Sequence, residues 1–182
     1  MKKLFLLATI AAVALTACKQ TTEPVDMEAE KEAIMKVIQN ESEFARDAKF
    51  EEFVNLYVHD EFNTRLRFLP DTFEIIKGWE NVRNRLAYID DREETELTTV
   101  NVSKENPLVK ITGNTAWVVC DNIWQGEYEG EEIYNESLQV TFLEKSEGEW
   151  KISLAGWFSK PEPDDDDEDD AEDEDEEEEE ED

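Results

Sequence analysis

The chain shows two kinds of hydrophobic patterning, and the first is helical. Between Met27 and Arg46 the apolar residues recur every three or four positions, which is the period of an amphipathic helix. Asp26 directly precedes this segment and is a suitable N-cap. Two shorter helices are expected at about 49–58 and 79–89, because the apolar residues of each fall on one face. All three helices therefore need an apolar surface to cover.

From residue 96 onward the pattern changes to that of β-structure, with Thr, Val, Ile, Trp and Tyr frequent and turn signals between the runs. Two of these turns are expected at Asn106-Pro107 and Gly113-Asn114. The expected strands lie near 96–104, 108–125, 131–145 and 149–158, the second of them interrupted by its turn. A further extended segment is expected around Arg65 and Arg67. Helices followed by an antiparallel sheet indicate the α+β class.

Residues 1–17 have the features of a bacterial lipoprotein signal peptide. A basic start is followed by a 12-residue apolar run, which at roughly 1.5 Å per residue is too short for a hydrocarbon core of ~30 Å. Leu15-Thr16-Ala17-Cys18 then resembles a lipobox. We expect Cys18 to carry acyl chains that attach the protein stably to a membrane, with 18–26 as a polar tether. This places the protein in the bacterial cell envelope, on the outer membrane facing the periplasm.

The charge of the chain is concentrated at its end. Of 49 acidic residues, 19 lie between Glu162 and Asp182, so residues 1–160 keep 30 acidic against 18 basic residues and a net charge of −12 out of the total of −31. Segment 161–182 lacks the apolar residues that a core needs, and a disordered acidic tail is predicted. Its simplest role is solvation, with weak binding of divalent cations as the alternative. A chain this acidic, without a basic stripe, is not expected to bind nucleic acid.

Several weak motifs follow one another in a familiar order. They are Ala48-Lys49-Phe50, Tyr57-Val58-His59-Asp60, Lys77-Gly78-Trp79, a tryptophan-rich central strand and the closing Gly148-Glu149-Trp150-Lys151-Ile152. In this order, residues 27–160 resemble the NTF2-like superfamily, particularly its SnoaL-like bacterial members. The resemblance implies a cone, in which a strongly curved antiparallel sheet wraps a long helix and leaves an open mouth for a ligand or substrate. It also implies that Trp150 packs under the helix.

Two polar positions could carry chemistry in such a cone. His59, the only histidine, stands beside Asp60 at a helix end and could act as a general base, or its cation could simply complement the helix dipole. Asp121 alternates with Trp117, so the two share a face of their strand. If that face lines the cone, Asp121 is a polar handle that an arginine of the 65–67 segment can pair with. If the face is solvated, Asp121 only keeps the sheet soluble.

The chain is rich in aromatic residues, with five tryptophans and four tyrosines. Small-molecule sites are commonly aromatic-lined hollows with a few polar groups, although the same residues also fill cores and dimer faces. The candidate ligand-binding residues are Tyr57, His59, Arg65, Arg67, Trp79, Trp117, Asp121 and Trp157. No cofactor and no metal site are expected, and a zinc site rich in nitrogen and sulfur ligands is not expected from one histidine and one unlipidated cysteine. Cys120 lies in an apolar stretch and is expected to be a buried, inert thiol.

These features together predict a lipid-anchored envelope protein whose domain binds a small apolar or amphipathic ligand, or a protein partner. The alternative is an enzyme of the isomerase, dehydratase or cyclase type that uses a carboxylate or His59 as its general base. A homodimer formed through the outer face of the sheet is a third expectation.

Overall fold

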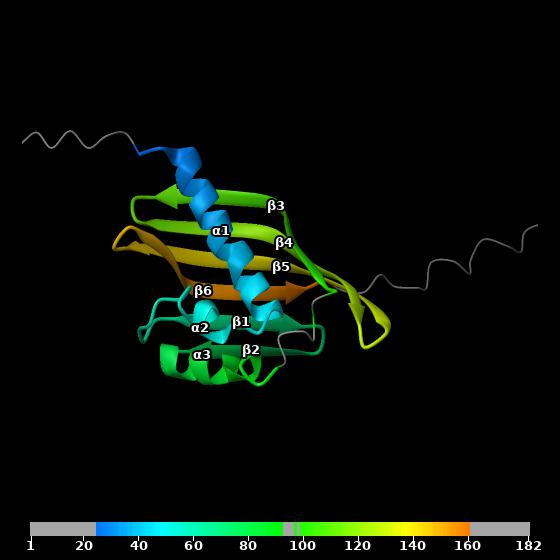
Figure 1. Cartoon of the computed structure of the whole chain (residues 1–182). Coiled ribbons are helices and arrows are strands. Elements are labelled where there is room, and N and C mark those ends of the chain that lie inside the picture. Colours follow the sequence, from blue (N-terminus) through cyan, green and yellow to red (C-terminus); the bar gives the residue numbers. More distant parts are fainter. Residues whose placement is uncertain (1–24, 93–96, 98, 161–182) are drawn as a thin grey trace, which may run out of the picture.

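The computed structural model describes residues 25–92, 97 and 99–160, in which the helices precede most of the strands (Figure 1). Cys18 and the acidic tail lie outside the described residues. The helices are α1 (Met27–Arg46), α2 (Phe50–Val54), α3 (Trp79–Leu86) and the 3₁₀ turn η1 (Ala87–Ile89). The strands are β1 (Thr64–Leu69), β2 (Thr72–Lys77), β3 (Asn101–Thr112), β4 (Thr115–Tyr128), β5 (Glu131–Ser146) and β6 (Glu149–Ser159). The predicted α+β class is confirmed.

Helix α1 begins and ends where the sequence predicts. Oδ1 of Asp26 accepts hydrogen bonds from the backbone N–H groups of Glu28 and Ala29, at 3.1 and 3.2 Å, and so satisfies two donors that the first helical turn leaves unpaired. Ile34 and Ile38 are fully buried, and the helix lies diagonally across one face of the sheet in Figure 1. Among the described residues, no helix is both long and apolar enough to cross a membrane.

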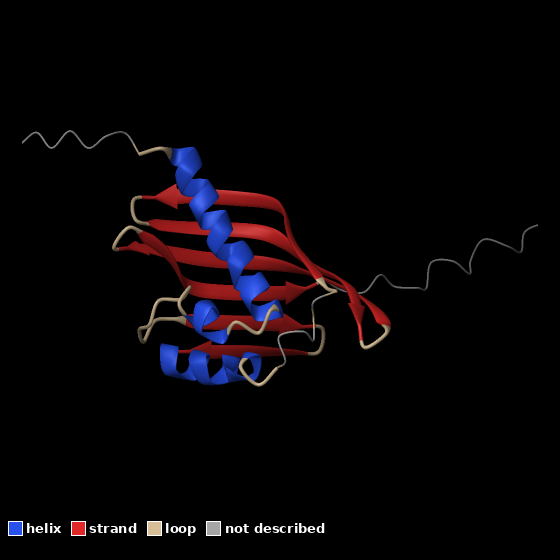
Figure 2. Cartoon of the chain, in the orientation of Figure 1, coloured by secondary structure: helices blue, strands red, loops and turns tan. Residues whose placement is uncertain are grey.

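One sheet of six strands, in the order β2-β1-β6-β5-β4-β3, supports these helices (Figure 2). All neighbouring strands are antiparallel except β1 and β6, which run parallel with Arg67 opposite Trp157. Helices α2 and α3 lie beside the β1–β2 edge, while α1 crosses the longer strands. The sheet therefore has an inner face, turned towards α1, and an outer face on the other side.

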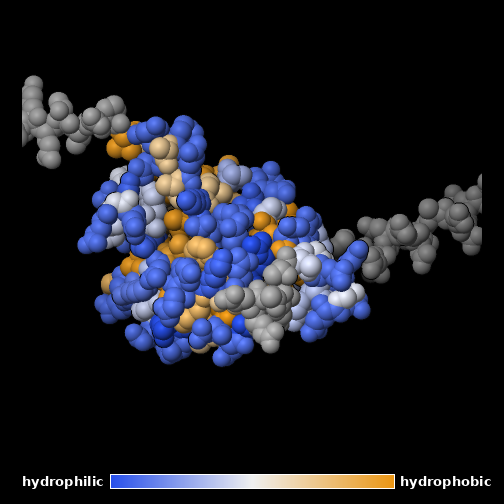
Figure 3. All heavy atoms as spheres, in the orientation of Figure 1, coloured by the Kyte–Doolittle hydropathy of each residue, from blue (hydrophilic) through white to orange (hydrophobic). Residues whose placement is uncertain are grey.

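The hydrophobic core lies between α1 and one end of the inner face. Three small side chains of β4, those of Ala116, Val118 and Cys120, face the helix and are buried. Trp150 is also buried, and its Nε1 donates a hydrogen bond of 2.7 Å to Glu30 of α1, as the resemblance implied. Burial raises the pKa of the Cys120 thiol, as expected for an inert cysteine. Around this core the exterior is mostly hydrophilic, with hydrophobic patches beside the helix (Figure 3).

Strand β3 differs from the sequence expectation. Asn106-Pro107 is not a turn between two strands, because β3 continues through it with a bulge between Glu105 and Leu108. Asn106 takes a φ of 50° there, a left-handed conformation that asparagine tolerates better than most residues. Proline is accepted because β3 is an edge strand, where one row of backbone N–H groups has no neighbour to bond.

Two smaller differences lie near the other edge of the sheet. The hydrophobic pattern does not predict β2. In this edge strand the large apolar side chains of Phe73 and Ile75 are 66% and 47% exposed, whereas apolar residues of a strand usually face the core. Helix α2 ends at Val54, earlier than the expected residue 58. Tyr57 instead forms a short parallel bridge with Ile152 of β6, which draws this segment into the sheet.

Candidate functional site

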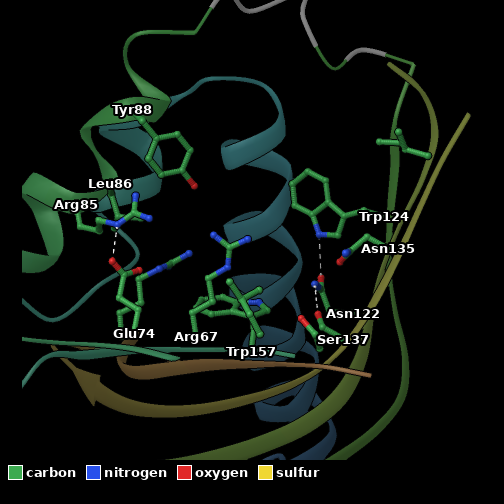
Figure 4. Close-up of a pocket in the computed structure, with 14 residues that line it drawn as sticks. Arg67, Glu74, Arg85, Leu86, Tyr88, Asn122, Trp124, Asn135, Ser137 and Trp157 are labelled. Carbon is green, nitrogen blue, oxygen red and sulfur yellow. Dashed lines mark hydrogen bonds and ion pairs between the residues drawn. The ribbon is translucent and has the colours of Figure 1, made fainter. Parts of the chain in front are cut away.

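A cavity of about 360 Å³ opens at the end of the inner face away from the core (Figure 4). We call it the main cavity. Its apolar walls are formed by Leu69, Leu86, Tyr88, Trp124, Ile133 and Trp157. A side cavity of about 220 Å³ shares Arg65, Tyr88, Trp124 and Trp157 with it and reaches Glu41 on α1. Pockets for small molecules commonly have about 300–1,000 Å³ and mostly apolar walls with a few polar groups, so the two together are large enough for one.

Three polar groups from α1, the α2–β1 connection and β1 meet at the inner end of the side cavity. Nη1 of Arg65 donates a hydrogen bond of 3.0 Å to the hydroxyl of Tyr57, which donates one of 2.9 Å to Oε1 of Glu41. Arg65 and Glu41 also form an ion pair at 3.6 Å. The guanidinium carbon of Arg65 lies 4.0 Å from the centre of the Trp157 ring, a stacking that planar guanidinium groups favour. Arg65 is thereby held in one orientation.

Burial disfavours the charged forms of Tyr57 and Arg65, with different outcomes. It raises the pKa of Tyr57 well above its usual 10, so the hydroxyl keeps its proton and remains a donor to Glu41. Burial opposes the charge of Arg65, but Tyr57 and Glu41 outweigh it and the pKa of the guanidinium is raised. Arg65 is therefore a permanent cation on the cavity wall.

A second cation, Lys104 of β3, lies between α1 and the inner face of the sheet. Its Nζ donates hydrogen bonds of 2.6, 2.5 and 2.6 Å to Ser42, Asn122 and Gln139. These three bonds use all of its protons. Burial lowers the pKa of Lys104, and the negative charge of Glu41 partly offsets this. Asn122 continues the network, because it donates to Ser137 at 3.1 Å and accepts from Trp124 at 3.3 Å.

The main cavity is cationic although the chain is strongly acidic. Its lining includes three guanidinium groups and one carboxylate. Nε of Arg85 is 2.9 Å from Glu74, so these two charges compensate each other, and Arg65 is compensated by Glu41. Arg67, in contrast, is exposed and makes no ion pair with any residue in the described ranges. One positive charge on the lining is therefore left over for a ligand.

Of the candidate residues named from the sequence, three line the main cavity: Arg65, Arg67 and Trp157. They come together because β1 and β6 are parallel neighbours, with Arg67 directly opposite Trp157. Alternation along β1 puts Arg65 on the same face. The expected extended segment around residues 65–67 thus supplies the polar wall of the cavity.

Trp117 and Asp121 do not line this cavity. They share a face of β4, as predicted, but it is the outer one, because Ala116, Val118 and Cys120 take the inner face. Trp117 is 36% exposed. Asp121 accepts a hydrogen bond of 2.7 Å from Asn106. This bond and, to a lesser extent, the nearby Lys160 lower the pKa of Asp121 below its usual 3.8.

The other three candidates lie at the α2–α3 end of the molecule. His59 stacks on Trp79 with 4.0 Å between ring centres, and its Nε2 is 2.9 Å from the carbonyl oxygen of Val54. Trp79 is 8% exposed and belongs to the core. Tyr57 is buried behind Arg65 rather than on a cavity wall. Asp60 is also engaged, since its Oδ1 accepts from two backbone N–H groups.

Sequence reasoning missed several residues that line the two cavities, among them Glu41, Tyr88, Asn122, Trp124 and Ser137. One signal for part of them was available. On β5 every second residue from 137 to 141 is polar, and these side chains are buried, whereas the apolar residues between them face outward or are half-buried. A strand with this inverted pattern has a polar inner face, which indicates a polar site there.

A larger hollow of about 790 Å³ lies at the far end of β3, β4 and β5 but is a weaker candidate. It is more open, and its charged lining residues, Glu127 and Glu132, are both exposed carboxylates. No buried polar network supports it within the described residues. We therefore assign the functional site to the main and side cavities.

No family model and no curated protein matches the sequence. Solved structures do match. An NTF2-like protein of Novosphingobium aromaticivorans has a TM-score of 0.58 at 16% identity, covering 73% of this chain and 83% of that one. A scytalone dehydratase-like protein of the same organism has 0.59 at 17% identity, covering 74% and 87%. The association domain of CaMKII from C. elegans has 0.58 at 22% identity, covering 72% and 97%.

These likenesses define the class of the fold. The chain has the NTF2-like fold, also described as cystatin-like, with helices packed on a curved six-stranded sheet. The fold that the sequence resemblance implied is confirmed.

Proposed function

We propose that this protein is a cell-envelope lipoprotein whose NTF2-like domain binds a small organic anion with a flat apolar part. The observation that carries the proposal is Arg67, a guanidinium on the lining of the main cavity whose charge no described residue compensates. A guanidinium recognises carboxylates through paired, charge-assisted hydrogen bonds. The sequence expectation of an apolar or amphipathic ligand is thereby narrowed to an anionic one.

The walls of the cavity fit the apolar part of such a ligand. Trp124 and Tyr88 face the space from opposite sides in Figure 4, and Arg67 lies near Trp157 at its floor. Aromatic rings favour stacked or edge-on contact with another flat ring. A ligand can therefore place a ring between the aromatic walls and its acid group against Arg67.

The likeness to a scytalone dehydratase-like protein is compatible with an enzyme, which is the alternative. Proton transfer needs a base within hydrogen-bonding reach of the substrate. His59, Asp60 and Asp121 do not line either cavity. The carboxylates that line the cavities are Glu41, whose Oε1 is already engaged by Tyr57 and Arg65, and Glu74, which is paired with Arg85. Binding is therefore the better supported function.

The homodimer expected from the sequence stays a prediction, and two observations support it. The outer face of the sheet exposes the large apolar residues Leu108, Trp117, Leu138 and Phe142. Exposed apolar patches of this kind commonly mark interaction surfaces. In addition, the neighbours of similar fold include association and hub domains of CaMKII. We place a second copy of the chain on this face.

The proposal can be tested with 2-naphthoate and its neutral isostere 2-naphthamide. A charge-assisted hydrogen bond is worth about 1.5–3 kcal/mol, and the lower end applies because Arg67 is exposed. Naphthoate should therefore bind about tenfold more tightly than naphthamide, since 1.4 kcal/mol is a factor of about ten. Isothermal titration calorimetry of the full chain measures both dissociation constants.

Arg67→Gln should abolish the preference for naphthoate, and Arg67→Lys should restore part of it. Arg83→Gln is the matched control, because Arg83 lies on α3 near Glu51 and Phe50 and does not line the cavity. It removes the same charge from the molecule and should keep the preference. Equal binding of the two probes, or equal effects of the two glutamine variants, would refute the anion site.

A further inference from the structure

The charges around the end of β6 differ between the two faces of the sheet. Lys160, the last described residue, contacts Asp121 and Glu136 on the outer side. On the inner side, Ser159 lines the main cavity together with Arg67 and Arg85. The chain therefore continues into its acidic tail from a point with carboxylates on one side and guanidinium groups on the other.

The segment that follows is a strong polyanion. Residues 161–182 contain 19 carboxylates and no basic residue. On the outer face Lys160 pairs with both Asp121 and Glu136, so one negative charge is left over there and repels such a segment. Arg67, which has no ion-pair partner among the described residues, attracts it to the inner face.

We propose that the acidic tail lies against the cationic opening of the main cavity, where its carboxylates contact Arg67, the guanidinium whose charge no described residue compensates. The tail then occupies the position that an anionic ligand needs. It is thus a competitor built into the chain, and its contact is electrostatic rather than apolar. This contact does not depend on the identity of the ligand.

The tail is long enough for this contact and close enough to favour it. Arg67 is paired in register with Trp157, and the tail begins four residues beyond Trp157, about 13 Å at the ~3.3 Å per residue of an extended chain. Twenty-two residues span at most roughly 75 Å when fully extended, so the middle of the tail can also reach the cavity. Tethering gives an effective concentration in the order of millimolar, so a weak contact is sufficient.

A spin label on the tail tests the proposal without any ligand. Ala171 is the one residue between 164 and 182 that is not acidic, so Ala171→Cys accepts a nitroxide and keeps every carboxylate. The full chain also carries Cys18→Ser, and Cys120 is buried and does not react. The label should broaden the indole N–H resonances of Trp124 and Trp157 in the cavity. Trp117, on the outer face, should be spared.

Arg67→Gln should reduce this broadening several-fold, and so should 0.5 M NaCl, which screens exposed charges. Arg83→Gln should leave the broadening unchanged, although it removes the same charge. Absent broadening, equal broadening of Trp117, or equal effects of the two arginine variants would overturn the proposal. The proposal would also be overturned if broadening required mixing spin-labelled chains with isotope-labelled chains that carry no spin label. The tail in the cavity would then belong to a second copy of the chain.

A titration separates this proposal from the ligand site. A full-length variant with all 19 tail carboxylates replaced by their amides should bind both naphthoate and neutral naphthamide several-fold more tightly. If the tail only repelled anions from a distance, the amide variant would bind naphthoate more tightly and naphthamide unchanged. That result would overturn the proposed contact. Failure of both probes to bind would count against the proposed ligand site and not against the tail contact, which the spin label reports by itself.

Discussion

Glu30 joins helix α1 to the far end of the sheet through both of its carboxylate oxygens. Lys145 donates to Oε1 at 2.5 Å, and the indole N–H of Trp150 donates to Oε2 at 2.7 Å. These two bonds lower the pKa of Glu30 below its usual 4.5, and the bond from Lys145 has the larger effect. A carboxyl whose pKa is lower in the folded state stabilises the fold above its unfolded pKa, and this contribution is lost as the pH falls through the folded pKa.

We therefore expect Glu30→Gln to lower the urea midpoint at pH 7 and to have much less effect near pH 3. The amide keeps the shape but removes the charge that Lys145 and Trp150 bond. Glu28→Gln is the matched control on the same helix, because Glu28 is exposed and pairs only with Lys31 among the described residues. It should change the midpoint little at either pH. A Glu30→Gln effect that is the same at both values would contradict the assignment.

At the scale of elements, α1 decides which face of the sheet is internal. The sequence pattern correctly groups Trp117 with Asp121 and Ala116 with Val118, because alternation along β4 is a local property. It cannot choose between the two groups, since both contain apolar residues. The helix makes the choice, because only small side chains such as Ala116 and Val118 leave room for it to approach the sheet.

Local sequence patterns cannot show which segments pack together, and this determines how much of the site the sequence could predict. Helix α1, its Asp26 cap and the arginines of β1 follow from local periodicity and were predictable. The opposition of Arg67 and Trp157 depends on the parallel pairing of β1 with β6, which joins segments about 90 residues apart. Glu41 also reaches the side cavity only through tertiary packing, and no local pattern marks it.

Two tryptophan variants test the assignment of faces. Trp150→Ala should cost about 3–5 kcal/mol, because Trp150 is 5% exposed in the core. Trp117→Ala should cost less than about 2 kcal/mol, because its ring lies 36% exposed on the outer face. Urea denaturation of both variants measures the two free energies of unfolding. Equal losses would show that the outer face of β4 is packed as tightly as the core.

At the scale of the whole molecule, charge is distributed by region rather than evenly. The chain has a net charge of −31, but the lining of the main cavity carries three guanidinium groups and one carboxylate. Selection of an anionic ligand by a polyanionic protein requires such a local reversal of sign, because the field of the whole molecule opposes the ligand's approach. We expect anion binding to be strengthened by moderate salt before high salt screens Arg67 as well.

The proposed attachment of this molecule to a membrane can be tested at Cys18. Cys18→Ser removes the thiol that would carry the acyl chains, and each buried CH₂ of those chains contributes about 0.8 kcal/mol to membrane binding. We therefore expect the variant to leave the membrane fraction for the soluble envelope fraction, as measured by fractionation and immunoblotting after a wash in high salt. Cys120→Ala is the matched control, because it removes the other cysteine, which is buried in the core, and should leave the protein on the membrane. Recovery of Cys18→Ser in the membrane fraction would mean that another part of the chain holds it there.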